Sequence, residues 1–173
     1  MTIRIILTVL GSDRPGLTQA LADAVLAAGG NWLESQLARM GGKYVGSVLV
    51  ELADDKLDML EQAVRKVDAS GLHVAIVPAG DDPSELDKAL SIELVGQDRP
   101  GIVREVTSVL AGLGVNIEEF SSDTENSAWS GGQLFRAKLQ LSLPPGATTD
   151  QLRDALEAIS GEIMVDFTIS AGV

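Results

Sequence analysis

The sequence predicts an α+β protein made of two βαββαβ units in tandem, each an antiparallel sheet with two helices on one face. Three observations predict this fold: a loop motif occurs twice, the apolar pattern after it occurs twice, and both halves alternate strand and helix periodicities. The two copies of the motif start 85 residues apart. They read Gly11-Ser12-Asp13-Arg14-Pro15-Gly16-Leu17 and Gly96-Gln97-Asp98-Arg99-Pro100-Gly101-Ile102.

A helix is expected after each copy of the motif. Apolar residues recur there at positions i, i+4, i+7, i+8 and i+11, which lie on one face of an α-helix. Gly29 and Asn31, at the helix exit, return as Gly114 and Asn116 at the same offset. The loop, the helix and its exit were therefore duplicated together. The apolar positions hold Leu17, Leu21, Ala24, Val25 and Ala28 in the first half and Ile102, Val106, Val109, Leu110 and Leu113 in the second.

The remaining strands and helices are predicted from the spacing of apolar residues and from turn residues. Gly41-Gly42 suits a tight hairpin because glycine tolerates the positive φ of primed turns. The second half repeats the order of the first from Leu90 onward, and Thr148 with Gln151 predicts a capping box at its second helix. In the first half we expect a second helix over 57–67 and strands over 3–10, 32–40, 44–52 and 72–76.

The two halves differ by an insertion. The offset between them grows from 85 residues at Asn116 to 90 at the second pair of hairpin glycines, Gly131-Gly132. We place the five added residues around Ser122 to Ser130 and expect a longer, irregular second strand or a loop there. Ala79 to Ser84 is the one good linker sequence. The expected first domain is 1–79, the linker 80–88 and the second domain 89–173.

Composition excludes several classes of function. Thirteen basic against 25 acidic side chains give a net charge of −12, and no run of Lys or Arg could offset it on one face, so direct nucleic-acid binding is not expected. Cysteine is absent, which excludes disulfides, thiolate catalysis and Cys-ligated metals and fits a cytoplasmic location. No apolar stretch approaches the roughly 20 residues that span a bilayer.

The repeated motif carries a family resemblance. A strand, then Gly-x-Asp-Arg-Pro-Gly-(Leu/Ile), then a helix ending in Gly-x-Asn and a second strand resembles the ACT domain, a small ferredoxin-like regulatory module that binds amino acids. The tandem pair, with Gly-Gly-Asn-Trp-Leu-Glu-Ser, the Met40-Gly41-Gly42 hairpin and Ser-Gly-Gly-Gln-Leu-Phe before a strand, is similar to the glycine cleavage system transcriptional repressor group. This resemblance implies no catalysis and no cofactor, a small amino acid ligand, a homodimer, and a partner such as a transcription factor.

Four residues of each half are predicted to bind the ligand. Glycine has no Cβ, so a ligand can approach the backbone, and the free N–H groups at a helix start favour a carboxylate. Aspartate can pair with an α-ammonium, and asparagine offers both donors and an acceptor. The predicted residues are Asp13, Gly16, Leu17 and Asn31 in the first half and Asp98, Gly101, Ile102 and Asn116 in the second.

Other interpretations stay open. Asp13 can instead cap the helix, Asn31 can serve a turn, and the loop arginines Arg14 and Arg99 are expected to be solvated or paired with a neighbouring Asp. The single histidine, His73, alternates with apolar residues, should face away from the core of its sheet and is assigned no catalysis. A ligand-free interaction module is the main alternative function. A small ferredoxin-like hydrolase or an RNA-binding unit fits less well, because aromatic residues make up 3% and the charge is negative.

Overall fold

The computed structural model describes residues 1–80, 89–126, 132–159 and 163–168. The chain divides into two compact units, Met1–Asp82 and Pro83–Val173. Each unit has the predicted βαββαβ order and one four-stranded sheet. The expected linker, 80–88, lies outside the described residues except for Gly80.

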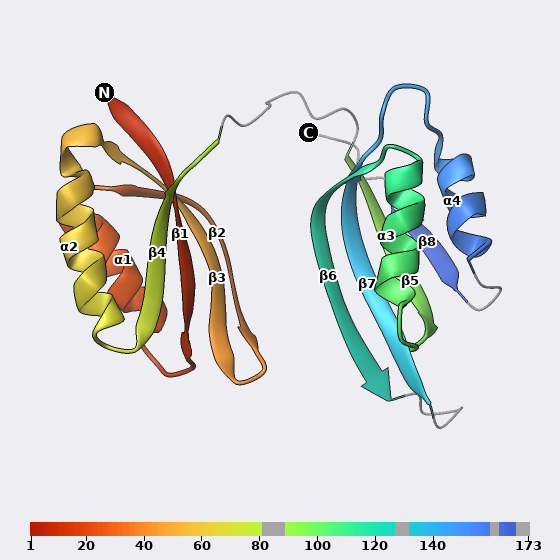
Figure 1. Cartoon of the computed structure of the whole chain (residues 1–173), viewed down its shortest axis with the longest axis horizontal. Coiled ribbons are helices and arrows are strands. Elements are labelled where there is room, and N and C mark those ends of the chain that lie inside the picture. The colour runs from red at the N-terminus through yellow and green to blue at the C-terminus, as the bar shows by residue number, and fades with distance from the viewer. Residues whose placement is uncertain (81–88, 127–131, 160–162, 169–173) are drawn as a thin grey trace. The chain divides into compact units, whose positions relative to one another are not determined.

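The first unit is a four-stranded antiparallel sheet with two helices on one side (Figure 1). The sheet order is β2-β3-β1-β4, so the first strand is central and the second lies at an edge. Each helix begins where a strand has left the sheet and returns the chain to the opposite end. The elements are β1 (Thr2–Ser12), α1 (Leu17–Ala27), β2 (Asn31–Met40), β3 (Lys43–Ala53), a short 3-10 helix (Asp54–Lys56), α2 (Leu57–Asp68) and β4 (Leu72–Pro78).

The second unit repeats this topology with sheet order β6-β7-β5-β8. The predicted capping box is confirmed: the Thr148 hydroxyl accepts the Gln151 N–H, and the Gln151 side chain accepts the Thr148 N–H, both at 3.2 Å. The elements are β5 (Ala89–Gln97), α3 (Ile102–Gly112), β6 (Asn116–Asn126), β7 (Gln133–Ser142), α4 (Thr149–Glu157) and β8 (Met164–Thr168).

The inserted segment extends a regular strand as far as the structure describes it. Strand β6 stays paired with β7 up to Asn126, which lies opposite Gln133. The first residues of the 122–130 stretch are therefore strand and not irregular, and 127–131 lie outside the described residues. A bulge between Trp32 and Glu34 in β2 recurs 85 residues later, between Ile117 and Glu119 in β6.

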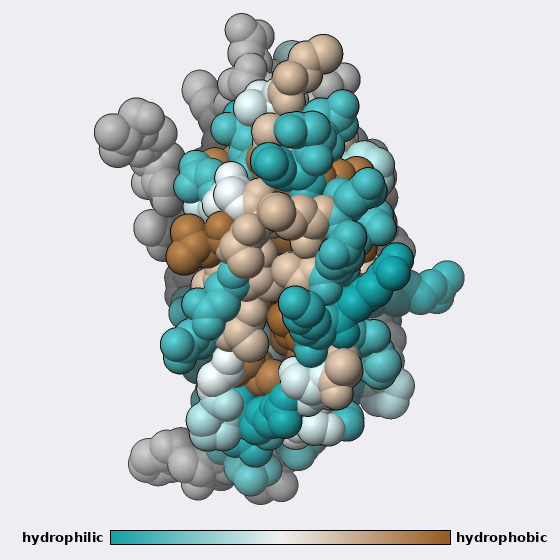
Figure 2. Space-filling model, turned by 90° about the vertical axis from the view of Figure 1, so that its left-hand side faces the viewer, coloured by the Kyte–Doolittle hydropathy of each residue, from teal (hydrophilic) through white to brown (hydrophobic). Residues whose placement is uncertain are grey.

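Each unit has its own apolar core between sheet and helices. Leu7, Leu21 and Leu60 are completely buried in the first unit, as are Leu110 and Leu141 in the second. Burial alternates along β1, so odd-numbered residues face the helices and even-numbered residues face the other side of the sheet. Seen from the side on which α1 and α2 lie, an apolar strip runs between hydrophilic borders (Figure 2).

Candidate ligand site at the loop before the first helix

The glycine at the helix start is left-handed in both units. Gly16 has φ 90° and Gly101 has φ 92°, a conformation that other residues rarely adopt. A Cβ at either position would meet no atom within 4 Å, so the space beside each glycine is open. No side chain caps α1 or α3, and the alternative in which Asp13 caps the helix is therefore wrong.

Leu17 and Ile102 are core residues. Their side chains are only 3% and 4% exposed and pack against the buried faces of their sheets. Only their backbone groups could contact a ligand, and the Ile102 N–H donates to the Arg99 carbonyl at 3.3 Å. The prediction that these two side chains belong to a ligand site is therefore not supported by their positions.

Asp13 lies on the surface beside the hairpin between β2 and β3. Its carboxylate is 3.3 Å from the Arg39 guanidinium, and its N–H reaches the Gly42 carbonyl at 3.5 Å. Two further contacts join the hairpin to the loop and helix: the Lys43 ammonium donates to the Ser12 hydroxyl at 3.1 Å, and the Thr18 and Tyr44 hydroxyls lie 2.5 Å apart. The sequence analysis missed these hairpin residues, although antiparallel pairing of β1 with β3 places the Gly41-Gly42 turn beside the loop.

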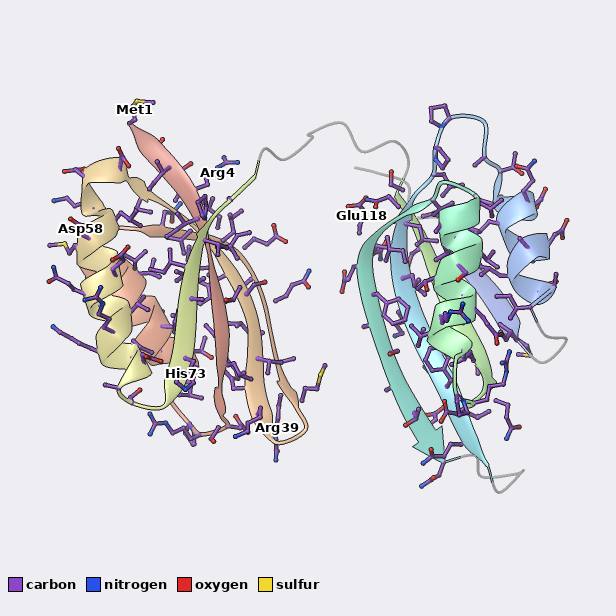
Figure 3. The ribbon with its side chains drawn as sticks, viewed as in Figure 1. Met1, Arg4, Arg39, Asp58, His73 and Glu118 are labelled. Atoms are coloured by element: carbon purple, nitrogen blue, oxygen red, sulfur yellow. The ribbon has the colours of Figure 1, made fainter. Side chains whose placement is uncertain are left out.

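Asn31 lies at the opposite end of the sheet from Asp13. It pairs with Glu51, which pairs with Arg4 near the start of β1, whereas the loop follows Ser12 at the end of that strand. Arg4 and Ser12 are eight positions apart, which is about 26 Å of strand at ~3.3 Å per residue. Figure 3 shows the separation: Arg4 and Arg39 mark the two ends of the unit. One small ligand cannot contact the loop and the asparagine of the same unit, so the predicted residues of one unit do not form a single site within it.

The second unit has the same loop arginine and asparagine, but these side chains have different partners there. The Arg99 guanidinium forms a two-pronged ion pair with Glu105, with N–O distances of 2.8 and 2.5 Å, and the Asn116 amide donates to Glu118. The residues 85 positions earlier are Ala20 and Leu33, so the first unit has no carboxylate at either place. There the Arg14 guanidinium donates to the Ser70 carbonyl instead. Arg14 and Arg99 were expected to be solvated or paired with an Asp, and neither partner is one.

The Arg99–Glu105 pair predicts how Glu105 titrates. The hydrogen bond from Arg99 lowers the pKa of the Glu105 carboxyl below its ordinary 4.5. A carboxyl with a lowered pKa stabilises the folded unit above its unfolded pKa, and this stabilisation is lost as pH falls through the folded pKa. We expect a carbon-detected NMR titration to place the Glu105 midpoint below 4.5, and Arg99→Gln to return it toward that value. Equal midpoints in the two proteins would disprove the pair in solution.

His73 faces away from the core, as expected. Its side chain is 79% exposed and lies 2.8 Å from the Asp68 carboxylate. The described residues bring together no group of three His, Asp or Glu side chains that could hold a metal ion. Among the helices that the structure describes, none has the length and apolar character needed to cross a bilayer.

Comparison with known families identifies the fold. An ACT domain profile matches residues 4–76, and a second ACT domain profile matches residues 90–157. The chain belongs to the ACT domain family. Its two ACT domains are the two ferredoxin-like units predicted from the repeat, so the predicted fold class is confirmed.

Two curated proteins with similar sequences differ in how much of their length the chain covers. Phosphoserine phosphatase SerB2 of Mycobacterium tuberculosis is 27% identical over 172 residues, which are 96% of this tandem ACT chain and 40% of the phosphatase. The glycine cleavage system transcriptional repressor of Escherichia coli is 20% identical over 169 residues, 96% of this chain and 88% of the repressor. The predicted similarity to the glycine cleavage repressor group is therefore confirmed.

Two solved structures match the tandem ACT fold. An unknown protein from Galdieria sulphuraria has a TM-score of 0.83 at 27% identity, covering 96% of this chain and 98% of that chain. A candidate glycine cleavage system transcriptional repressor has a TM-score of 0.74 at 18% identity, covering 98% and 99%. The second match, at so low an identity, is evidence for the fold alone.

Proposed function

We propose that this chain is a non-catalytic sensor that binds a small amino acid and signals to a regulatory protein by direct contact. Two ACT domains account for most of the chain, and its repressor relative is covered over 88% of its length. The phosphatase relative extends well beyond the matched 40%, so its named activity does not argue for catalysis in these two domains.

The observation that carries the proposal is the left-handed glycine with open space beside it at the start of each first helix. The first hydrogen bond of α1 runs from the Ala20 N–H to the Gly16 carbonyl at 2.9 Å. The amides before Ala20 precede this bond and, without a side-chain cap, can receive a carboxylate.

Asp13 and Asn31 supply the remaining partners for a zwitterion. The Asp13–Arg39 ion pair is exposed, and such pairs contribute about 0–1 kcal/mol, so a ligand ammonium can replace it. No side-chain hydrogen bond joins Asn31 to another residue in the described part of the chain. Because Asp13 and Asn31 lie at opposite ends of one unit, a shared ligand must lie between the loop of one copy of the chain and the Asn31 end of a second copy.

The first unit is the better candidate for binding. In the second unit Arg99 is neutralised by Glu105 and the Asn116 amide is held by Glu118. A ligand carboxylate there would compete with a charge-assisted, two-pronged pair, the stronger class of hydrogen bond. We therefore assign the ligand site to Asp13, Gly16 and Asn31, with Asp98, Gly101 and Asn116 as a weaker or vestigial set.

The signal passes to another protein in this proposal. A net charge of −12 opposes binding to a phosphate backbone, so a repressor of this kind would act through a partner transcription factor. The chain functions as a homodimer in the cytoplasm, and needs neither metal nor cofactor.

A thermal-shift screen of the twenty amino acids, followed by calorimetry, tests the proposal. A ligand at 100 times its Kd adds about 2.7 kcal/mol to the free energy of unfolding, which such a screen detects. We expect one or a few small amino acids to stabilise the chain, and Glu105→Gln to leave their affinity unchanged because the first unit binds. If no amino acid binds at millimolar concentration, the sensor proposal fails and the ligand-free interaction module replaces it.

A further inference from the structure

The two sheets differ in the face that points away from their helices, which we call the open face. In the first unit, two rows of this face are largely apolar: Ile6, Leu49 and Val77 lie side by side, and so do Leu10, Val45 and His73. Leu10 is 52% exposed and Val77 is 42% exposed. Between the two rows lies a third row, in which β1, β3 and β4 place the small side chains of Thr8, Ser47 and Ala75. The edge strand β2 adds the exposed Glu34 to the row of Ile6, Gln36 to the third row and Ala38 to the row of Leu10.

The open face of the second unit has polar or charged side chains at three of the matching places. Strand pairing puts Ser91 and Gln140 where the first unit has Ile6 and Leu49, and Arg136 where it has Val45. The Arg136 guanidinium lies 2.6 Å from the Glu93 carboxylate and 2.8 Å from the Glu125 carboxylate. Ion pairs cross the middle of this face. The first unit has exposed apolar side chains there, and its Arg4–Glu51 ion pair lies in the row beyond Ile6.

The open face of the first unit has a shallow hollow beside β1 and β4. It has a volume of about 310 Å³, and its lining comes from β1, β4 and the end of α2: Thr8, Val9, Leu10, Asp68, His73, Val74 and Ala75. The lining is apolar at Leu10, Val74 and Ala75 and polar at Thr8, Asp68 and His73, and the volume can receive a side chain of the size of valine or isoleucine. The face is therefore both apolar and uneven, as protein interfaces are.

We infer that the open face of the first unit is an interface with the same face of a second copy of this chain, the two sheets packed face to face with their strands antiparallel. The row of small side chains lies midway between the two apolar rows. A two-fold axis over Ser47, across the strands, sets the Ile6 row of one copy against the Leu10 row of the other. Val77 of each copy then reaches the hollow of its partner.

Charge complementarity favours a second copy as the occupant. Glu51 and Lys43 lie on the open face of β3, four residues to either side of Ser47. Within one copy Glu51 lies 3.3 Å from the Arg4 guanidinium and Lys43 donates to the Ser12 hydroxyl, and both contacts are exposed enough to admit a further charged partner. The same two-fold axis therefore sets Glu51 of each copy against Lys43 of the other, so one geometry matches the apolar rows and opposite charges. With the axis along the strands, Glu51 would meet Glu51.

The area of the face is sufficient for a stable dimer. Four strands ~4.8 Å apart and about eight residues long cover roughly 500 Å² in projection, and accessible area exceeds projected area. A stable interface buries about 800 Å² on each partner, which is of the same order.

Sedimentation velocity of the full chain without ligand tests this interface. We expect the wild type to sediment as twice 18.1 kDa at ~10 µM, and Leu49→Glu to weaken self-association at least a hundredfold because each dimer would bury two unpaired carboxylates. The matched control is Gln140→Glu, at the same place in the second unit, which should leave the dimer intact.

A second set of variants changes charged side chains outside the apolar core. Lys43 is exposed, and Lys43→Glu should weaken the dimer about tenfold by setting like charges against each other, whereas Glu51→Lys added to it should restore much of the affinity. A monomer at every concentration, a dimer unaffected by Leu49→Glu in a chain with native circular dichroism, or equal loss in Gln140→Glu would each overturn the interface. Because no ligand is present, these outcomes are separate from any failure of amino acid binding.

Discussion

Replacing Gly46 by alanine is expected to destabilise the first ACT domain by about 3 kcal/mol or more. Gly46 lies within β3 at φ 149°, and a Cβ built on it would be 1.9 Å from the Gln36 carbonyl oxygen of β2. The obstructing atom belongs to the backbone of a paired strand, so β2 must shift or detach from the sheet. We expect amide NMR signals of the first unit to disappear at a lower urea concentration than in the wild type.

The second unit supplies the control for this prediction. Ala137 of β7 occupies the place that Gly46 has in β3, and it is buried without strain, so the topology itself accepts a Cβ there. An unchanged unfolding midpoint in Gly46→Ala would show that β2 can shift without loss of stability and would refute the argument.

A second glycine substitution is expected to have the opposite effect. Gly112 ends α3, and a Cβ added to it would meet no atom within 4 Å, so Gly112→Ala should stabilise the second unit by about 0.5–1 kcal/mol.

The helices, strands and turns could be predicted from the sequence because each is determined largely by residues close to it in the chain. The Gly41-Gly42 pair has φ 57° and 78° and forms the expected hairpin, and the Thr148 capping box forms through contacts three residues apart. The duplicated bulge at Trp32/Glu34 and Ile117/Glu119 carries no such local signal, because it depends on pairing with a neighbouring strand.

The candidate site was harder to predict because it depends on where elements end. Asp13 and Asn31 belong to one repeated segment, but α1 runs antiparallel to β1 and carries Asn31 to the far end of the sheet. Arg99 and Glu105 are six residues apart and meet only because the loop before α3 turns back on the helix. Offsets in a sequence show which residues were duplicated together, and they do not show which of them meet.

The proposed dimer and the proposed ligand site both involve two copies of the chain. Asn31 lies in the strand row of Glu51 and Arg4, and the loop follows the row of Ser12 and Lys43. A two-fold axis over Ser47 exchanges these two ends, so the loop end of one copy and the Asn31 end of the other lie at the same end of the proposed dimer. The interface and the ligand site, inferred from different residues, both require a second copy whose strands run antiparallel to those of the first.

Asn31→Ala is therefore expected to weaken amino acid binding by roughly ten- to a hundredfold, since a hydrogen bond to a charged group contributes about 1.5–3 kcal/mol. Asn116→Ala is the matched control and should change the affinity little, because Glu118 already holds that amide. Calorimetry on each variant measures both values. Equal losses in the two variants would contradict the assignment of the site to the first unit.

Mixing two variants with weakened binding tests whether one ligand contacts both copies. Asp13→Ala and Asn31→Ala each remove one half of every site in their own homodimers, but a mixed dimer holds one site with Asp13 from one copy and Asn31 from the other. Because an isologous interface builds each site from both copies, an equal mixture should recover about one quarter of the wild-type sites after exchange. Recovery of none, while each variant remains dimeric, would mean that Asp13 and Asn31 do not share a ligand across the interface.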